Sequence, residues 1–164
     1  MDQPIVAIVA AKDAWREYPK TRAYVCQPDR YFRDGVTHLG FYTGNEIKPL
    51  VPRIRAYHPN VRLTREEANR WRGSDDREVG DLLDLLLDHP SHLGTPPRRH
   101  GEAHGVVLLT PQDSPETVRL PHAIENDKVD RAGSRCAWTQ NQRYVGLDQL
   151  TSGVASTSEL ETGR

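Results

Sequence analysis

Short apolar runs separated by turn residues fill the first third of the chain, a pattern typical of β-strands. Residues 4 to 11, PIVAIVAA, form an uninterrupted β-branched run that predicts a buried strand. Residues 21 to 27 predict a second strand and residues 36 to 44 a third. A Thr-Gly-Asn turn then leads into residues 46 to 54, whose two prolines place that segment at a sheet edge. We therefore expect a hairpin formed by the last two segments.

Helical periodicity appears in the middle of the chain. Thr64 to Glu67 have a capping-box sequence, which predicts a short helix ending near Arg72. A second helix is predicted from about residue 75, because its apolar residues fall at i, i+3, i+4, i+7 and i+8: Val79, Leu82, Leu83, Leu86 and Leu87. The aspartates of this helix lie outside that stripe, so we interpret them as a solvated face: Asp81, Asp84 and Asp88.

The second half has weaker patterns. Residues 89 to 105 are rich in Pro, Gly and His and predict an exposed, mobile loop. Residues 106 to 110 and 116 to 124 predict strands, and residues 136 to 150 a strand followed by a short helix. From residue 151 onward the Ser, Thr and Gly content predicts a flexible tail.

Strands on both sides of a helical segment predict an α+β fold. We expect a small mixed or antiparallel β-sheet or barrel with a central two-helix insertion. The 164 residues suit one domain with a real core, so we assign residues 1–150 to a single domain and residues 151–164 to the tail.

The composition favours a cytoplasmic protein. No apolar run approaches the roughly 20 residues that span a bilayer, and the first residues lack the basic region of a secretion signal. We therefore expect no membrane partner. Cys26 and Cys136 show no metal-binding spacing, so we expect both to be reduced and structural.

Charge is distributed unevenly along the chain. Residues 1 to 72 hold 13 basic against 8 acidic residues, whereas residues 73 to 95 hold 1 against 6. Clustered basic charge is what a polyanion partner requires, and 18 of the 22 basic residues are Arg, which suits bidentate phosphate contacts. The acidic helix at residues 75–88 offers a possible docking face for a protein partner.

One candidate chemistry is metal-dependent phosphodiester cleavage. Pro28-Asp29, followed by Glu46-x-Lys48, resembles the PD-(D/E)xK nuclease signature. In that signature two carboxylates hold Mg²⁺ and a lysine positions or activates the attacking water. Here the acidic pair is Asp29 and Glu46, and the lysine is Lys48.

A second candidate is base and phosphate recognition. Arginines alternate with aromatics in residues 21 to 33, and a Trp lies beside amides and Arg in residues 137 to 144. Arginines suit phosphates, aromatics suit base stacking, and amides suit base edges. The candidate nucleic-acid-binding residues are Arg22, Arg30, Tyr31, Arg33, Trp138, Gln140 and Arg143.

Histidines suggest two further possibilities. His100 and His104 have i, i+4 spacing around Glu102, as zinc ligands do on a helix. The flanking glycines and prolines oppose a helix there, so we predict surface histidines and assign no metal site. A catalytic dyad for nucleophilic catalysis, formed by Cys26 and His38, would require the fold to bring these two distant residues together.

The succession AYVCQ, THLGFYTGNEI and PLVPRI, with a late VRLPHAI and an Arg-Tyr segment, resembles the PUA-like superfamily of small barrels, of the ASCH and EVE kind. The resemblance covers residues 5 to 60 and 104 to 148 and carries no site residue over. It implies nucleic-acid binding, often of RNA or of modified bases, generally without catalysis by the domain itself; the choice between DNA and RNA stays open. Our leading hypothesis is thus a non-catalytic nucleic-acid-binding module without a cofactor. A Mg²⁺-dependent nuclease and a protein- or small-molecule-binding domain are the alternatives.

Overall fold

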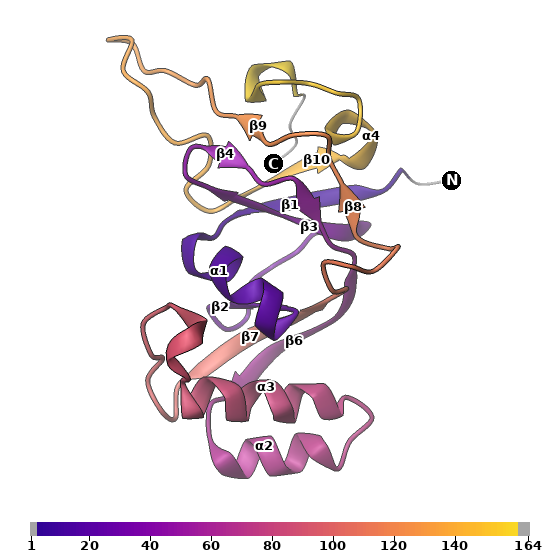
Figure 1. Ribbon diagram of the computed structural model, residues 1–164, viewed down its shortest axis with the longest axis vertical. Coiled ribbons are helices and arrows are strands. Elements are labelled where there is room, and N and C mark those ends of the chain that lie inside the picture. Colours follow the sequence, from indigo (N-terminus) through magenta and orange to yellow (C-terminus); the bar gives the residue numbers. More distant parts are fainter. Residues whose placement is uncertain (1–2, 161–164) are drawn as a thin grey trace. The chain divides into compact units, whose positions relative to one another are not determined.

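The computed structural model describes residues 3–160, and the contacts of the chain form two compact units. Unit 1 comprises Met1–Trp15, Phe32–Ile54 and Thr110–Arg164, and unit 2 comprises Arg16–Tyr31 and Arg55–Leu109. The chain was expected to form one domain up to residue 150. Each unit contains its own sheet, as the ribbon in Figure 1 shows.

Unit 1 is built on a five-stranded mixed sheet with the strand order β10-β1-β3-β4-β9. Strand β1 runs parallel to β3 and antiparallel to β10. The five strands are β1 (Ile5–Ala10), β3 (Val36–Thr43), β4 (Glu46–Ile47), β9 (Ile124–Glu125) and β10 (Gln142–Gly146). The predicted α+β fold with a mixed sheet is therefore confirmed. The sheet is open, with β10 and β9 at its edges.

The apolar run at the N-terminus explains the central place of β1. Residues 6 to 9 are fully buried, as a strand with a neighbour on each side and covered faces requires. The predicted hairpin is also present: β3 pairs antiparallel with β4. Its turn residues Gly44 and Asn45 both have left-handed φ angles, of 61° and 60°, as a type I′ turn demands.

Shorter elements complete unit 1. The predicted extended segment at residues 46 to 54 is interrupted after β4. It continues in β5 (Leu50–Val51), which pairs with β8 (Val118–Arg119). Helix α4 (Leu147–Leu150) follows β10 directly, as the predicted strand-then-helix segment requires. The strand in that segment begins only at Gln142. The residues before it form an irregular excursion from the sheet, seen in orange in Figure 1.

Residues 151–160, expected to be a flexible tail, are packed against unit 1. They form the short 3₁₀ helix η2 (Thr157–Glu159), and Ser156 bridges to Glu125 of the edge strand β9. Thr157 and Leu160 are buried, and Leu160 belongs to the hydrophobic core of this unit. Composition alone misses this because a few side chains in a Ser/Thr-rich segment anchor it: Val154, Thr157, Ser158 and Leu160. Residues 161–164 of the predicted tail lie outside the described residues.

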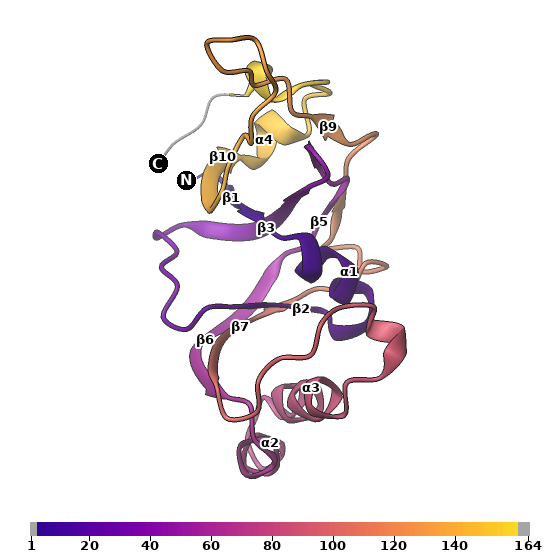
Figure 2. The same ribbon diagram turned by 90° about the vertical axis from the view of Figure 1, so that its left-hand side faces the viewer.

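Unit 2 has a three-stranded sheet with the order β2-β7-β6. Its strands are β2 (Ala23–Cys26), β6 (Ile54–Arg62) and β7 (Ala103–Leu109). Its helices are α2 (Arg65–Arg72), α3 (Arg77–Asp88) and the 3₁₀ helix η1 (Ser91–Leu93). Helix α1 (Lys12–Thr21) begins in unit 1 and ends in unit 2. In Figures 1 and 2, α3 lies between the sheet and α2.

The two predicted helices of the insertion are confirmed. Thr64 caps α2 by accepting a hydrogen bond from the Glu67 backbone N–H at 3.1 Å. The Glu67 carboxylate accepts from the Arg62 N–H rather than from Thr64, so the capping box is only half formed. The predicted apolar stripe of α3 packs on the sheet, with Val79, Leu82, Leu83 and Leu86 all buried.

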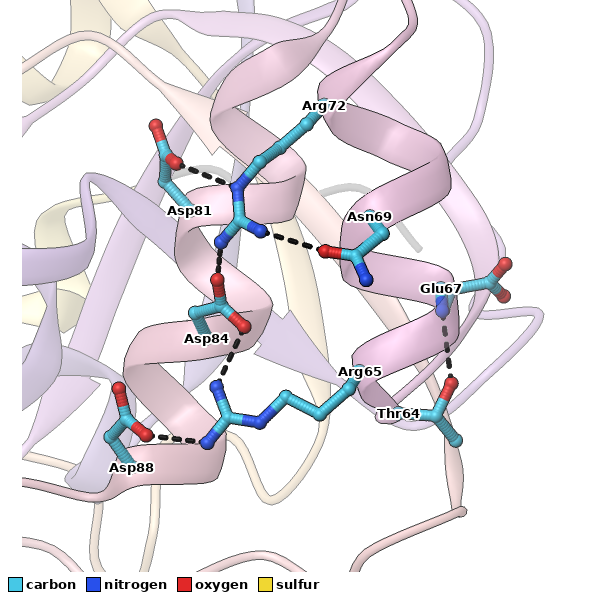
Figure 3. A network of polar contacts seen from close by, with 8 residues as sticks. All are labelled: Thr64, Arg65, Glu67, Asn69, Arg72, Asp81, Asp84 and Asp88. Atoms are coloured by element: carbon cyan, nitrogen blue, oxygen red, sulfur yellow. Dashed lines mark hydrogen bonds and ion pairs between the residues drawn. The ribbon is translucent and has the colours of Figure 1, made fainter.

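Two aspartates of α3 are solvent-exposed as the sequence predicts, with the Asp81 and Asp88 side chains 77% and 65% exposed, but all three also pair with arginines. Figure 3 shows that they face two arginines of α2. Arg65 donates to Asp84 at 2.7 Å and to Asp88 at 2.5 Å, and Arg72 pairs with Asp81 and Asp84. The Asp84 side chain is only 22% exposed. Pairing within the helix hairpin neutralises this acidic surface, which weakens the case for a protein docking there.

Residues 89–105 also differ from the predicted mobile loop. The Arg98 guanidinium donates two hydrogen bonds to the Glu17 carboxylate of α1, at 2.8 and 2.6 Å, and the Thr95 hydroxyl donates a third at 2.5 Å. The Glu17 side chain is 2% exposed. A buried carboxylate needs such partners, so this charge pair fixes the segment to unit 2. Strand β7 then begins at Ala103, three residues earlier than predicted.

Candidate functional site

Two adjoining hollows in unit 1 share the residues Lys128, Trp138 and Arg143. The smaller has a volume of about 260 Å³ and is completed by Asp127, by the segment at Thr157 and Ser158, and by Leu160. Arg143 lies on the edge strand β10, whereas Lys128 and Trp138 come from the excursion between β9 and β10. The packed residues 157–160 close the other side.

The larger hollow, of about 540 Å³, extends along residues 136 to 143. Three consecutive amides line it: Gln140, Asn141 and Gln142. Both Gln140 and Asn141 are exposed. The hollows together therefore present cations, amides and hydroxyls around one aromatic residue.

Trp138 is not the open stacking surface that the sequence suggested. Its side chain is 3% exposed, and it belongs to the core with Tyr42, whose ring centroid lies 6.1 Å away. The Arg143 guanidinium lies over the indole, 5.0 Å from the ring centroid. The indole is buried in the apolar core of unit 1. It holds Arg143 in place instead of meeting a base itself.

Asp127 is the only acidic residue that lines the smaller hollow among the described residues. It accepts from the Ser158 hydroxyl at 2.5 Å, from the Ser158 backbone N–H at 2.9 Å and from the Thr157 hydroxyl at 2.9 Å. These hydrogen bonds, that of the Ser158 hydroxyl foremost, lower the pKa of Asp127 to about 2. The carboxylate is therefore ionised at neutral pH and accepts hydrogen bonds without donating any.

The predicted arginines are divided between the units. In unit 1 the Arg33 guanidinium lies 4.7 Å from the Tyr144 ring centroid, on the edge strand β10. In unit 2 the Arg30 guanidinium lies over Tyr24 and donates to its hydroxyl at 2.9 Å. The interleaved arginines and aromatics of the sequence thus form stacked pairs within each unit.

Two other predicted residues also belong to unit 2. Arg22 follows α1 with a left-handed φ of 52°, and its carbonyl accepts from the Leu109 N–H at 2.9 Å. Tyr31 is 73% exposed. Neither residue lines the hollows beside Arg143.

The three residues of the nuclease signature are also divided. Asp29 belongs to unit 2, where its N–H donates to the Pro59 carbonyl. Glu46 and Lys48 belong to unit 1 and form an ion pair at 3.2 Å. Among residues 3–160 no group of three or more His, Cys, Asp or Glu side chains has the arrangement of a metal site.

Cys26 is buried, whereas Cys136 is partly exposed and lines the larger hollow. Burial raises the pKa of Cys26 to about 11, which suppresses the reactive thiolate. Burial, with the nearby Arg53 charge, lowers the pKa of His38, and its Nδ1 lies 2.7 Å from the Thr37 hydroxyl. Cys26 and His38 belong to different units. His104 lies in β7, where burial lowers its pKa as well.

No family model matches the chain, and neither a curated protein nor a solved structure matches it. The resemblance to the PUA-like superfamily therefore stays a prediction. No described helix is long and apolar enough to cross a membrane.

Sequence reasoning missed Asp127, Lys128 and Ser158 as site residues. Ser158 lies some 30 positions from the other two and was assigned to the tail. The signal available was the pair of turn sequences around Asp127 and Asp130, which indicates an ordered excursion between strands. Asp130 indeed closes a turn by accepting from the N–H groups of Ala132 and Ser134.

Proposed function

We propose that unit 1 binds nucleic acid, without catalysis, through the two hollows around Arg143. One observation carries the proposal: Lys128 and Arg143 line the same pair of hollows, next to amides and hydroxyls. Two cations beside concave polar surface are what a phosphate with an attached base requires.

The excursion between β9 and β10 adds to this basic surface. Its tip carries Arg131 and Arg135, both exposed, at a point where Val129 bridges to Arg135. The nearby acids are fixed by local hydrogen bonds: Asp130 by its turn and Asp127 by residues 157 and 158. Arg131 and Arg135 therefore add positive charge to the excursion that carries Lys128.

An unpaired strand suits the hollows better than a duplex does. Both hollows are small, and the guanidinium of Arg143, held over the indole, is a planar cation on which a base can stack. The amides at residues 140–142 are suited to the hydrogen-bonding edges of an exposed base. Bases within a duplex have those edges paired.

The decisive measurement follows binding and cleavage together. Labelled single- and double-stranded DNA and RNA are incubated with the protein in Mg²⁺ or in EDTA, and both anisotropy and strand length are recorded. We expect binding without cleavage, weakening between about 50 and 200 mM salt because phosphate contacts release counterions.

Arg143→Gln tests the site. It removes one phosphate contact, so the slope of log affinity against log salt is expected to fall by about 0.7. Arg119→Gln is the matched control, because Arg119 is exposed on β8 and lines neither hollow. Equal affinities and slopes for the two variants would contradict the proposal.

Cleavage that requires Mg²⁺ and disappears in Lys48→Ala would instead support the nuclease alternative. Binding to none of the polymers would direct attention to protein or small-molecule ligands.

A further inference from the structure

The smaller hollow is lined by side chains of opposite hydrogen-bonding character. Lys128 and Arg143 can only donate, whereas ionised Asp127 can only accept. A molecule that fills the hollow therefore needs an acceptor directed at the cations and a donor directed at the carboxylate. This requirement distinguishes among the bases.

Asp127 is held in place by its neighbours. Hydrogen bonds from Thr157 and Ser158 reach both of its carboxylate oxygens, at 2.5 to 2.9 Å. Asp127 is exposed and lines the hollow, so its carboxylate is accessible to a hydrogen-bond donor of a ligand. A fixed acceptor loses little conformational freedom when it binds, so it discriminates between ligands better than a freely rotating side chain.

A phosphate is not expected next to Asp127, because two anions would then lie side by side. The phosphate group is expected at the cations, and the group directed at Asp127 must be a neutral donor. Among the bases, cytosine, adenine and guanine each carry an exocyclic amine that can donate to a carboxylate. On their Watson–Crick edge, uracil and thymine offer only a ring N–H between two carbonyl oxygens. A carboxylate repels those two oxygens.

We propose that the smaller hollow selects a base carrying an exocyclic amino group, cytosine in preference to uracil, with Asp127 as the specificity-determining acceptor. The inference rests on the proposed nucleic-acid binding and adds the class of base to it. Lys128 and Arg143 supply affinity in the same hollow, and Asp127 supplies the discrimination.

The test compares oligo-dC with oligo-dU, each about 12 nucleotides long, at neutral pH and fixed salt. These strands have the same backbone and differ in the exocyclic group and the adjacent ring nitrogen. We expect dissociation constants about three- to tenfold lower for oligo-dC, the range of one hydrogen bond to a charged but exposed acceptor.

Asp127→Asn converts the fixed acceptor into a group that also donates. The preference for oligo-dC is expected to fall to about unity, while total affinity is kept or increased because a negative charge is removed. Asp130→Asn is the matched control, since Asp130 holds a turn in the same excursion without lining the hollow, and it should keep the preference.

The outcomes separate the two proposals. Equal, salt-sensitive affinity for oligo-dC and oligo-dU overturns the base preference and leaves nucleic-acid binding intact. A full preference for oligo-dC in Asp127→Asn likewise overturns the role of Asp127 and leaves nucleic-acid binding intact. Binding to neither strand overturns the proposed function itself.

Discussion

Replacing Glu17 with Gln is expected to destabilise unit 2 strongly. The Glu17 carboxylate is 2% exposed and accepts both guanidinium hydrogen bonds of Arg98, whose side chain is 17% exposed, together with that of Thr95. Removing one partner of a buried ion pair costs about 3 to 5 kcal/mol, because the remaining charge stays buried without compensation. The amide retains one acceptor, so we expect the lower end, about 3 kcal/mol.

Urea unfolding followed by far-UV circular dichroism measures this loss directly. In a thermal melt followed by the same signal, the melting temperature should fall by roughly 6 to 12 °C, at about 2 to 4 °C per kcal/mol for a chain of this size. Glu66→Gln is the control, since Glu66 is exposed on α2 and its substitution should change stability by less than about 0.5 kcal/mol.

A double-mutant cycle with Arg98→Met tests the cause. Once Glu17 is replaced, the loss of Arg98 should cost much less than it does alone, because the two groups stabilise each other. A Glu17→Gln protein as stable as Glu66→Gln, or strictly additive losses, would refute the reasoning.

Three further predictions follow from particular contacts. Gly80→Ala should cost about 1 to 3 kcal/mol in urea unfolding, because the added Cβ would lie 2.5 Å from the Ala68 carbonyl of α2, whereas Gly73→Ala meets nothing closer than 3.6 Å. Cys26, with a pKa near 11, should be about 0.1% thiolate at pH 8, so mass spectrometry should find its peptide unlabelled by a thiol reagent until the protein unfolds. The lowered pKa of Asp127 stabilises the fold above about pH 4, and this contribution is lost as pH falls through about 2. Ser158→Ala should raise that pKa in a carboxyl NMR titration, and an unchanged value would contradict the assignment.

Local periodicity determined much of the fold. The β-branched run at residues 4 to 11 predicts a buried strand because such side chains favour extended backbone and lose no solvation partners inside. The Gly44-Asn45 pair determines the β3–β4 turn because few residues adopt two successive left-handed φ angles. The stripe of α3 identifies its buried face in the same way.

The site depended on side chains that are distant in sequence. Asp127 and Ser158 meet only because residues 157–160 pack on the core, and Trp138 supports Arg143 because its indole is buried. Composition records that such groups exist and cannot say which of them face one another.

Local pattern by itself thus determined the α+β class, the hairpin and the two-helix insertion, since hydrogen bonding and burial over a few residues specify them. Only the tertiary structure decided where the charges lie. Asp84, predicted to be solvated, pairs with two arginines of α2, and Glu17, for which the sequence pattern made no prediction, is buried against Arg98. The energy of a charge depends on its burial and its partners, which are properties of the folded chain.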